Sequence, residues 1–215
     1  MIYNRIKWFL KLIKTRGIRS AFSKLGRELY QKKKWVVLKL PTNTSPTKIA
    51  IEESAQTLKM NIGDHDIFAQ LAIIWPSDFP AYNKIALCQE FESRIDENTT
   101  GYYLQENDQA IGAMWLSNNE GNLKTTSCSL GKEDKIVKNL FISPSEHGRS
   151  LAKQLVYKSI LDARSRNTKN IYALVYPERV ASIKTFLALG FHQAGLLNST
   201  TFLFKTKLNL HINED

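Results

Sequence analysis

The sequence contains few of the residues that build a metal centre or a disulfide framework. Its 215 residues include only two cysteines and four histidines. Cys88 and Cys128 lie far apart, at a separation that matches neither a metal-binding motif nor a disulfide scaffold. The histidines are scattered along the chain. We therefore expect no metal site, and a low cysteine content is typical of the reducing cytoplasm.

Long apolar runs are also missing. Lys7, Lys11 and Lys14 interrupt the apolar residues near the N-terminus, and no stretch approaches the roughly 20 apolar residues that a membrane span requires. A secretory leader would need an unbroken apolar segment followed by small residues. We therefore expect the N-terminus to be retained and the protein to be cytoplasmic.

Acidic residues are nearly absent from the first 40 positions. This segment has 12 lysines and arginines against one acid, Glu28, whereas the rest of the chain has 18 bases and 19 acids. The formal net charge of +10 therefore arises entirely at the N-terminus. We interpret the chain as a nearly neutral domain that carries a basic arm.

The arm is amphipathic as well as basic. Its first apolar residues recur at helical spacing, as Ile2, Ile6, Phe9, Leu10 and Ile13 do. Residues 1–33 therefore form either an interfacial helix on an anionic membrane, or a helix packed on its own domain or on a second subunit. A nucleic-acid-binding arm is disfavoured, since such tails tend to be polar and irregular.

The remaining patterns predict one larger domain. Residues 35–40 resemble a strand that ends at Pro41, and we group them with the arm as residues 1–40, followed by a linker at 41–54. Residues 55–210 then predict a strand at 57–62, helices at 64–74 and 81–95, a hairpin at 100–117, strands at 121–130 and 135–143, a helix at 148–166, a strand at 170–176, a helix at 179–191, and late strands at 192–197 and 200–208. The order predicts a mixed α/β fold around one strand–helix–strand unit.

The turn inside that unit is the strongest candidate for a binding site. In the stretch FISPSEHGRSLAKQL, a strand meets a polar turn and then a helix. A helix N-terminus favours an anion, because its first amides lack intrahelical acceptors. Gly148 and Ser150 are small enough for a ligand to approach the backbone, and Arg149 adds a cation. The alternative is an ordinary helix start capped by Ser145 or Ser150.

Two blocks of sequence resemble the GNAT acyltransferase superfamily. Ile142-Ser143-Pro144 matches its strand-ending step, and residues 147–152 occupy its loop, although His147 replaces the usual Arg or Gln and Ser150 the usual Gly. The segment 179–191 resembles its second block. The resemblance covers roughly residues 55–207 and implies a central, mostly antiparallel mixed sheet flanked by helices.

The resemblance also implies a cofactor, acetyl-CoA or a longer acyl-CoA, and an amine acceptor. The pantetheine of this cofactor would lie along Phe141 and Ile142. The thioester of the cofactor would lie where two central strands separate. Arg179 and Ser182 would lie near the cofactor, where Arg179 would reach a phosphate or an acidic substrate. The pyrophosphate would be held by the loop residues His147, Gly148, Arg149, Ser150, Leu151 and Ala152.

The proton-transfer groups depart from the family pattern. Phe186 replaces the usual tyrosine acid, and the strand at 136–143 carries no acidic base. Catalysis then rests on positioning, which supplies roughly 7–11 kcal/mol, together with proton transfer relayed by water. Alternatively, Tyr176 is the acid. Asn139 is a candidate for orienting a water. We expect an N-acyltransferase that acts near the inner membrane face on a small molecule or a lipid-linked sugar. The alternative is a catalytically silent acyl-CoA-binding module.

Overall fold

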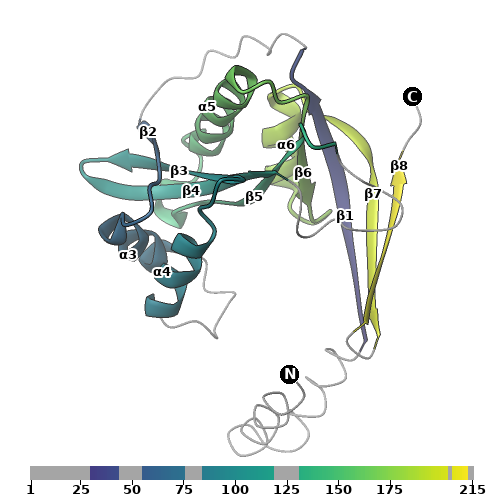
Figure 1. Ribbon diagram of the computed structural model, residues 1–215, viewed down its shortest axis with the longest axis horizontal. Helices are drawn as coiled ribbons and strands as arrows, with labels where there is room; N and C mark the ends of the chain where they lie inside the picture. Colours follow the sequence, from purple (N-terminus) through teal and green to yellow (C-terminus); the bar gives the residue numbers. More distant parts are fainter. Residues whose placement is uncertain (1–29, 44–54, 76–83, 119–130, 203–204, 213–215) are drawn as a thin grey trace, which may run out of the picture.

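The computed structural model describes residues 30–43, 55–75, 84–118, 131–202 and 205–212. Within these ranges eight strands form one sheet in the order β2-β3-β4-β5-β6-β1-β7-β8 (Figure 1). The strands are β1 (Tyr30–Pro41), β2 (Gln56–Lys59), β3 (Thr99–Glu106), β4 (Gln109–Asn118), β5 (Lys135–Ile142), β6 (Asn170–Val175), β7 (His192–Phe202) and β8 (Lys205–Ile212). The helices are α3 (His65–Ile74), α4 (Lys84–Ser93), the short 3-10 helix η1 (Pro144–Glu146), α5 (Leu151–Ser165) and α6 (Val180–Ala188).

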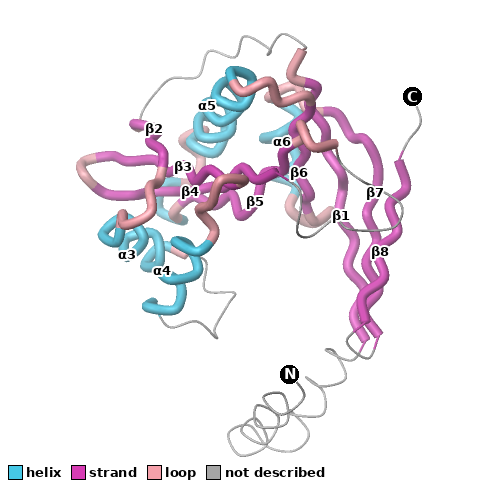
Figure 2. The backbone as a smooth tube through the Cα atoms, viewed as in Figure 1, coloured by secondary structure: helices cyan, strands magenta, loops and turns pink. Residues whose placement is uncertain are grey.

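The predicted mixed, mostly antiparallel sheet is confirmed. Among the described strands only β5 and β6 pair in parallel, and α5 connects them, so the expected strand–helix–strand unit is present. Helices α5 and α6 cover one face of the sheet, and α3 and α4 cover part of the other (Figure 2). None of the described helices is long and apolar enough to cross a bilayer.

Strand β4 lies between the two helical layers and is buried from Ala110 to Ser117. Alternate residues point to opposite faces of a strand. Met114 and Leu116 therefore join the core under α5, while Ala113 and Trp115 join the core under α3 and α4. Burial on both faces explains why this segment is apolar almost without interruption.

Strand β1 differs from the sequence-based grouping. We placed residues 35–40 with the arm, whereas β1 lies inside the sheet, between β6 and β7. Val36, Leu38 and Leu40 belong to the core on the α5 side, and Val37 belongs to a cluster on the other face. The strand begins at Tyr30, so the lysine run before Trp35 pairs with β7 and does not end a helix. Pairing with β7 holds this polar stretch extended, and pairing with β6 is added from Val36 onward.

The two C-terminal strands have different bounds from those predicted. The late strands expected at 192–197 and 200–208 are instead the longer β7 and β8. These two strands pair with each other from Gly195–Ile212 to Phe202–Lys205. The strand expected at 121–130, the helical patterns of residues 1–29 and most of the 41–54 linker lie outside the described residues.

An ionic network fastens α5 to the sheet edge. Asp162 Oδ1 accepts a hydrogen bond from Lys59 Nζ at 2.5 Å. Asp162 Oδ2 accepts a hydrogen bond from Tyr102 Oη at 2.5 Å and forms an ion pair with Arg166 Nη2 at 3.2 Å. Burial alone would raise the pKa of Asp162, but these donors outweigh it and lower the pKa below its ordinary value. The carboxylate therefore stays ionised and joins α5 to β2 and β3.

We expect Asp162→Asn to lower the free energy of unfolding by about 2 kcal/mol at pH 7, since charge-assisted hydrogen bonds are lost. A carboxyl whose folded pKa is lowered contributes stability above its unfolded pKa and loses it as the pH falls through the folded value. Urea unfolding should therefore show the difference narrowing below about pH 4. A difference that stays constant down to pH 2.5 would contradict the network's role.

Candidate functional site

The two parallel strands at the centre of the sheet pair over only part of their length. Their register runs from Lys135–Ile171 to Val137–Ala173 and then stops. Strand β5 continues to Ile142 and β6 to Val175, so the two strands separate beyond the last pair. The result is a gap between strand edges, at the end of the unit that leads into the loop at 143–150.

The backbone of Ile142 faces this gap. Ser143 N donates to Ile111 O at 2.8 Å, so Ser143 and Ile111 form a hydrogen-bonded pair of the β4–β5 ladder. Because such pairs alternate with non-bonded pairs, Ile142 and its partner Gly112 form a non-bonded pair. The N–H and C=O of Ile142 therefore point away from β4, toward the side where β6 diverges.

Phe141 and Ile142 are thus placed differently. The same alternation directs the backbone groups of Phe141 toward β4, and its side chain is buried among Trp75 and Trp115 on the α3–α4 side. The sequence assigned the same role to both residues. Of the two, Ile142 has backbone groups available to a ligand in the gap.

The loop after β5 presents amides at the start of α5. Gly148 and Ser150 have positive φ values of 92° and 58°. The first bonds of the helix run from Lys153 N and Gln154 N to Ser150 O, at 2.9 and 3.1 Å. Amides before these residues are the ones that a helix leaves without intrahelical acceptors. The side chain of Ser150 makes no capping hydrogen bond, so Ser150 does not provide the serine cap of the alternative interpretation.

The loop is also open toward solvent. Residues 147–150 are exposed, and a Cβ built on Gly148 would have no atom within 4 Å. Leu151, by contrast, is buried in the core and Ala152 is partly buried, so these two anchor the first turn of the helix. The exposed part of the predicted loop can receive an anion, and the buried part fixes its backbone.

Arg149 is held by two carboxylates. Its guanidinium donates to both oxygens of Glu106, at 2.6 and 2.8 Å, and also donates to Glu146. These bonds raise the pKa of Arg149, and the same pairing lowers the pKa of Glu106. Since Glu106 ends β3, the arginine joins the loop to the β3–β4 hairpin.

His147 turns back over the end of β5. Its Nε2 lies 3.2 Å from Ile142 O, at hydrogen-bonding distance. This oxygen is one of the groups that face the gap, so a ligand that needs it must share it with His147 or displace the ring. The family's usual arginine or glutamine is replaced here by a residue that contacts the strand itself.

Asn139 lies at a bulge in β5. The β4–β5 register shifts between Ala113 and Trp115, and Asn139 has a φ of 53°. With its amide oxygen turned toward Arg94, Asn139 accepts hydrogen bonds from both terminal nitrogens, at 2.5 and 3.2 Å. Asn139 therefore anchors Arg94, a contact that the sequence did not predict, and the water-orienting role stays a prediction.

Arg94 connects this bulge to an aromatic cluster. Its guanidinium carbon lies 4.9 Å from the ring centroid of Trp115, 5.4 Å from Phe91 and 5.6 Å from Trp75. Glu90, one helical turn earlier, accepts from the same group. Cations over aromatic faces are attracted to the ring quadrupole. Arg94 and Glu106 were not predictable as site residues, because nothing in the local sequence pattern shows which distant residues they meet.

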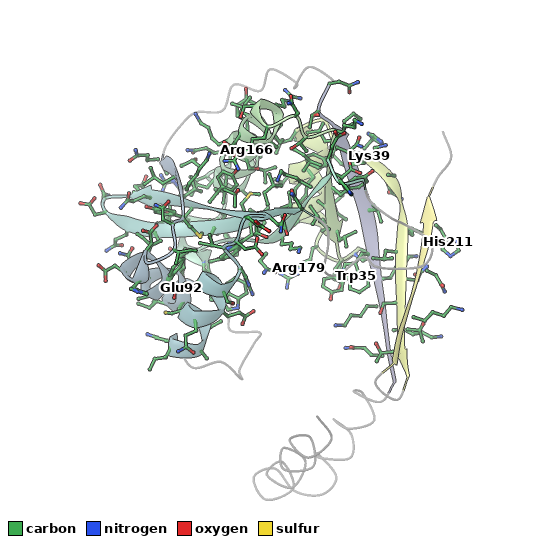
Figure 3. All side chains as sticks on the ribbon, in the orientation of Figure 1. Trp35, Lys39, Glu92, Arg166, Arg179 and His211 are labelled. Carbon is green, nitrogen blue, oxygen red and sulfur yellow. The ribbon has the colours of Figure 1, made fainter. Side chains whose placement is uncertain are left out.

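The other candidates lie beyond the far edge of the gap. Tyr176 follows β6, is half-buried and stacks on Trp35 of β1 with centroids 5.4 Å apart. Arg179 is exposed at the start of α6, and its amide donates to Tyr176 O; Figure 3 labels Trp35 and Arg179. Ser182 is partly buried on α6. Phe186 is only 3% exposed and packs edge-on against Phe191, so it belongs to the core.

The comparison with protein families identifies the class that this fold and site define. The family model described as "Acetyltransferase (GNAT) family" matches residues 65–191. The chain therefore belongs to the GNAT acetyltransferase family. A comparison with curated proteins gave no match.

Solved structures agree on the fold. The aminoglycoside N-acetyltransferase AAC(6')-Iy, in complex with CoA, matches with a TM-score of 0.53 and 18% identity over 70% of this chain and 91% of that one. The 6'-N-acetyltransferase AAC(6')-Ih of Acinetobacter baumannii matches with a TM-score of 0.51 and 15% identity over 65% and 92%. A functionally unknown protein of Staphylococcus epidermidis matches with a TM-score of 0.54 and 10% identity over 84% and 65%. At these identities the likeness shows the fold alone.

Proposed function

We propose that the protein is an acyl-CoA-dependent N-acyltransferase, with acetyl-CoA as the simplest donor. The observation that carries the proposal is the continuity of the site. An exposed loop at a helix N-terminus leads along the free edge of Ile142 into the gap between β5 and β6. An anionic end, an extended amide-bearing arm and a terminal thioester match these three parts in order.

The residues present fit such a donor. The open surface at Gly148 admits a pyrophosphate. The N–H and C=O of Ile142 point away from β4 and suit the amides of pantetheine, with the carbonyl oxygen shared with His147 or released by it. Acetyl-CoA supplies a thioester carbonyl to the amine, and the chain binds, orients and handles protons around it. Arg179, exposed near the far edge of the gap, is our candidate for a phosphate contact, with Ser182 beside it on α6.

Proton handling is proposed for Tyr176. Its hydroxyl belongs to a side chain held by stacking on Trp35, at the end of the strand that borders the gap. A positioned phenol can protonate the leaving thiolate. Asn139 lies on the other strand, where its amide can orient a water. Phe186 takes no part, because it is buried away from the gap.

The test is release of free thiol from acetyl-CoA with a panel of amines, including amino sugars and lipid-linked amino sugars. We expect release with at least one acceptor and a fall of about tenfold or more in Tyr176→Phe. A thermal-shift series of acyl-CoAs of rising length would identify the preferred acyl group. Binding of CoA with no release for any amine is the result expected of a silent acyl-CoA-binding module.

The paired state of Arg149 leads to a separate prediction. Arg149→Ala leaves two carboxylates unpaired beside the proposed pyrophosphate site, so we expect CoA to bind about tenfold more weakly. The double variant Arg149→Ala with Glu106→Gln should recover much of this loss. Isothermal titration measures both. Equal affinities of the single and double variants would show that Glu106 has no electrostatic effect on the loop.

We further propose that residues 1–33 hold the enzyme on an anionic membrane. The support is the excess of bases over acids in the first 40 positions, together with exposed lysines on β1 and β8. Lys32 and Lys207 both pair with Thr200, so they share one face of the sheet. Each basic residue near such a surface contributes about 1 kcal/mol, screened by salt.

Vesicle co-sedimentation tests the membrane proposal with the full chain. Lys7→Glu, Lys11→Glu and Lys14→Glu are combined in one variant, which leaves β1 intact. The unmodified chain should pellet with phosphatidylglycerol vesicles, less so in high salt, and the variant should stay largely in solution. Equal pelleting of the two, or pelleting of neither, would refute the proposal and favour an arm packed on protein.

A further inference from the structure

Lys138 occupies the point where β5 and β6 separate. Val137, immediately before it, forms the last parallel pair with Ala173. Val137 belongs to the core under α5, and alternation along the strand therefore directs Lys138 to the opposite face. Its partner across β4 is Trp115, which belongs to the aromatic cluster on that face. Lys138 thus lies on the α3–α4 side at the closed end of the gap.

The surroundings of Lys138 lower the pKa of its ammonium group. The side chain is partly buried, and burial lowers the pKa of its ammonium group. Asp96 acts in the opposite direction, whereas the guanidinium of Arg94 lowers the pKa further. Arg94 is fixed over the ring of Trp115, so the like charge is permanently close to this lysine. A neutral amine is a nucleophile, and a protonated one is not.

We propose that Lys138 is itself an acceptor: the bound acyl-CoA acylates its Nζ. The inference rests on the proposed function. With the pyrophosphate at the loop and pantetheine along Ile142, the acyl end of the donor points toward the last β5–β6 pair. Lys138 is the next residue of β5 beyond that pair, on the face opposite α5.

The step needs no further reactant. The Nζ lone pair attacks the thioester carbonyl carbon, the new N–C bond forms and the C–S bond breaks. The proton that nitrogen loses goes to the departing thiolate, so the products are N-acyl-lysine and free coenzyme A. The side chain then carries no charge, and the cation beside Arg94 is removed.

Lys135 on the same strand serves as a matched control. It is also partly buried and its pKa is also lowered, mainly by burial. However, it pairs with Ile171 at the start of the parallel ladder, and its Nζ donates to Asn118. Burial and lowered pKa are therefore common to both lysines, whereas only Lys138 lies beside the gap.

The test is peptide mass spectrometry of the full chain incubated with isotopically labelled acetyl-CoA. Because the site concentrates the thioester near one amine, Lys138 should acquire label at least about tenfold faster than Lys135. Ser150→Glu, which blocks the loop, should lose this preference, whereas acetic anhydride should still label its lysines. In the Lys138→Arg variant, the intact-protein mass should no longer show the rapid addition of one acetyl group.

Two results would overturn the inference while leaving the proposed function intact. One is release of thiol with an external amine and no labelling of Lys138. The other is equal labelling of Lys138 and Lys135, or labelling that Ser150→Glu does not change, since either would indicate unassisted chemistry. Failure of the proposed function is recognised separately, as an absence of acetyl-CoA binding in isothermal titration or an absence of thiol release with every external amine.

Discussion

Ser150→Glu is expected to weaken the binding of CoA by about 100-fold. Ser150 lies at the N-terminal end of α5, with its side chain exposed and making no capping hydrogen bond. A carboxylate there would face the proposed pyrophosphate at short range. Two like charges a few ångströms apart near a protein surface repel by about 3 kcal/mol, which corresponds to the expected loss.

Ser150→Gly is the matched control at the same position. Ser150 has a φ of 58°, a left-handed conformation that glycine adopts without strain. We expect Ser150→Gly to raise the free energy of unfolding by about 1 kcal/mol and to keep its affinity for CoA. Isothermal titration of both variants measures the affinity for CoA, and urea unfolding measures the free energy of unfolding. Together they separate the effect of the added charge from the effect of the backbone conformation at position 150. Normal affinity in Ser150→Glu would refute the assignment of the loop.

Gly112→Ala is expected to lower the free energy of unfolding by about 2–3 kcal/mol, because the β4–β5 pair leaves no room for a methyl group. A Cβ at Gly112 would lie 2.5 Å from Ile142 Cδ1 and 2.9 Å from the carbonyl oxygen of Phe141. The side chain can rotate away, but the carbonyl belongs to the backbone of β5. Relief of the contact must therefore move the strand that borders the gap.

Gly101→Ala on the neighbouring β3 provides the comparison. Its nearest contact would be Met60 Sδ at 2.6 Å, the flexible part of a side chain. We expect a loss of about 1 kcal/mol or less there, with unchanged CoA affinity. Gly112→Ala should in addition weaken CoA binding, because Ile142 shifts. Thermal unfolding measures the stability of the two variants, and isothermal titration measures their affinity for CoA. Equal affinities for CoA would contradict the proposed contact between Ile142 and the cofactor.

The fold was largely predictable because its main signals are local. The helix at α5, the β3–β4 hairpin and the strand β6 each carry a periodic pattern that burial imposes on the sequence. The loop between β5 and α5 was recognisable for the same reason, since small residues follow an apolar strand. The place of β1 in the sheet was not predictable, because pairing with β6 and β7 leaves no mark within its own sequence.

The site was only partly predictable. The sequence identified the loop, but it did not reveal that Arg149 is paired with Glu106 or that His147 contacts Ile142. It identified Asn139 but not Arg94, which comes from a distant segment and meets the bulge only after folding. Contacts of this kind depend on sheet order and register, which residue patterns do not encode.

The position of β1 also has a consequence for biosynthesis. The ribosome releases β1 long before its partners, Val175 of β6 and Leu196 of β7. Until then the apolar residues of β1 have no sheet to join. Non-local strand pairing is slow and leaves unpaired strand edges exposed. The nascent chain therefore completes its central sheet only after β6 and β7 have been made, and chaperones that bind extended apolar segments have a long opportunity at this strand.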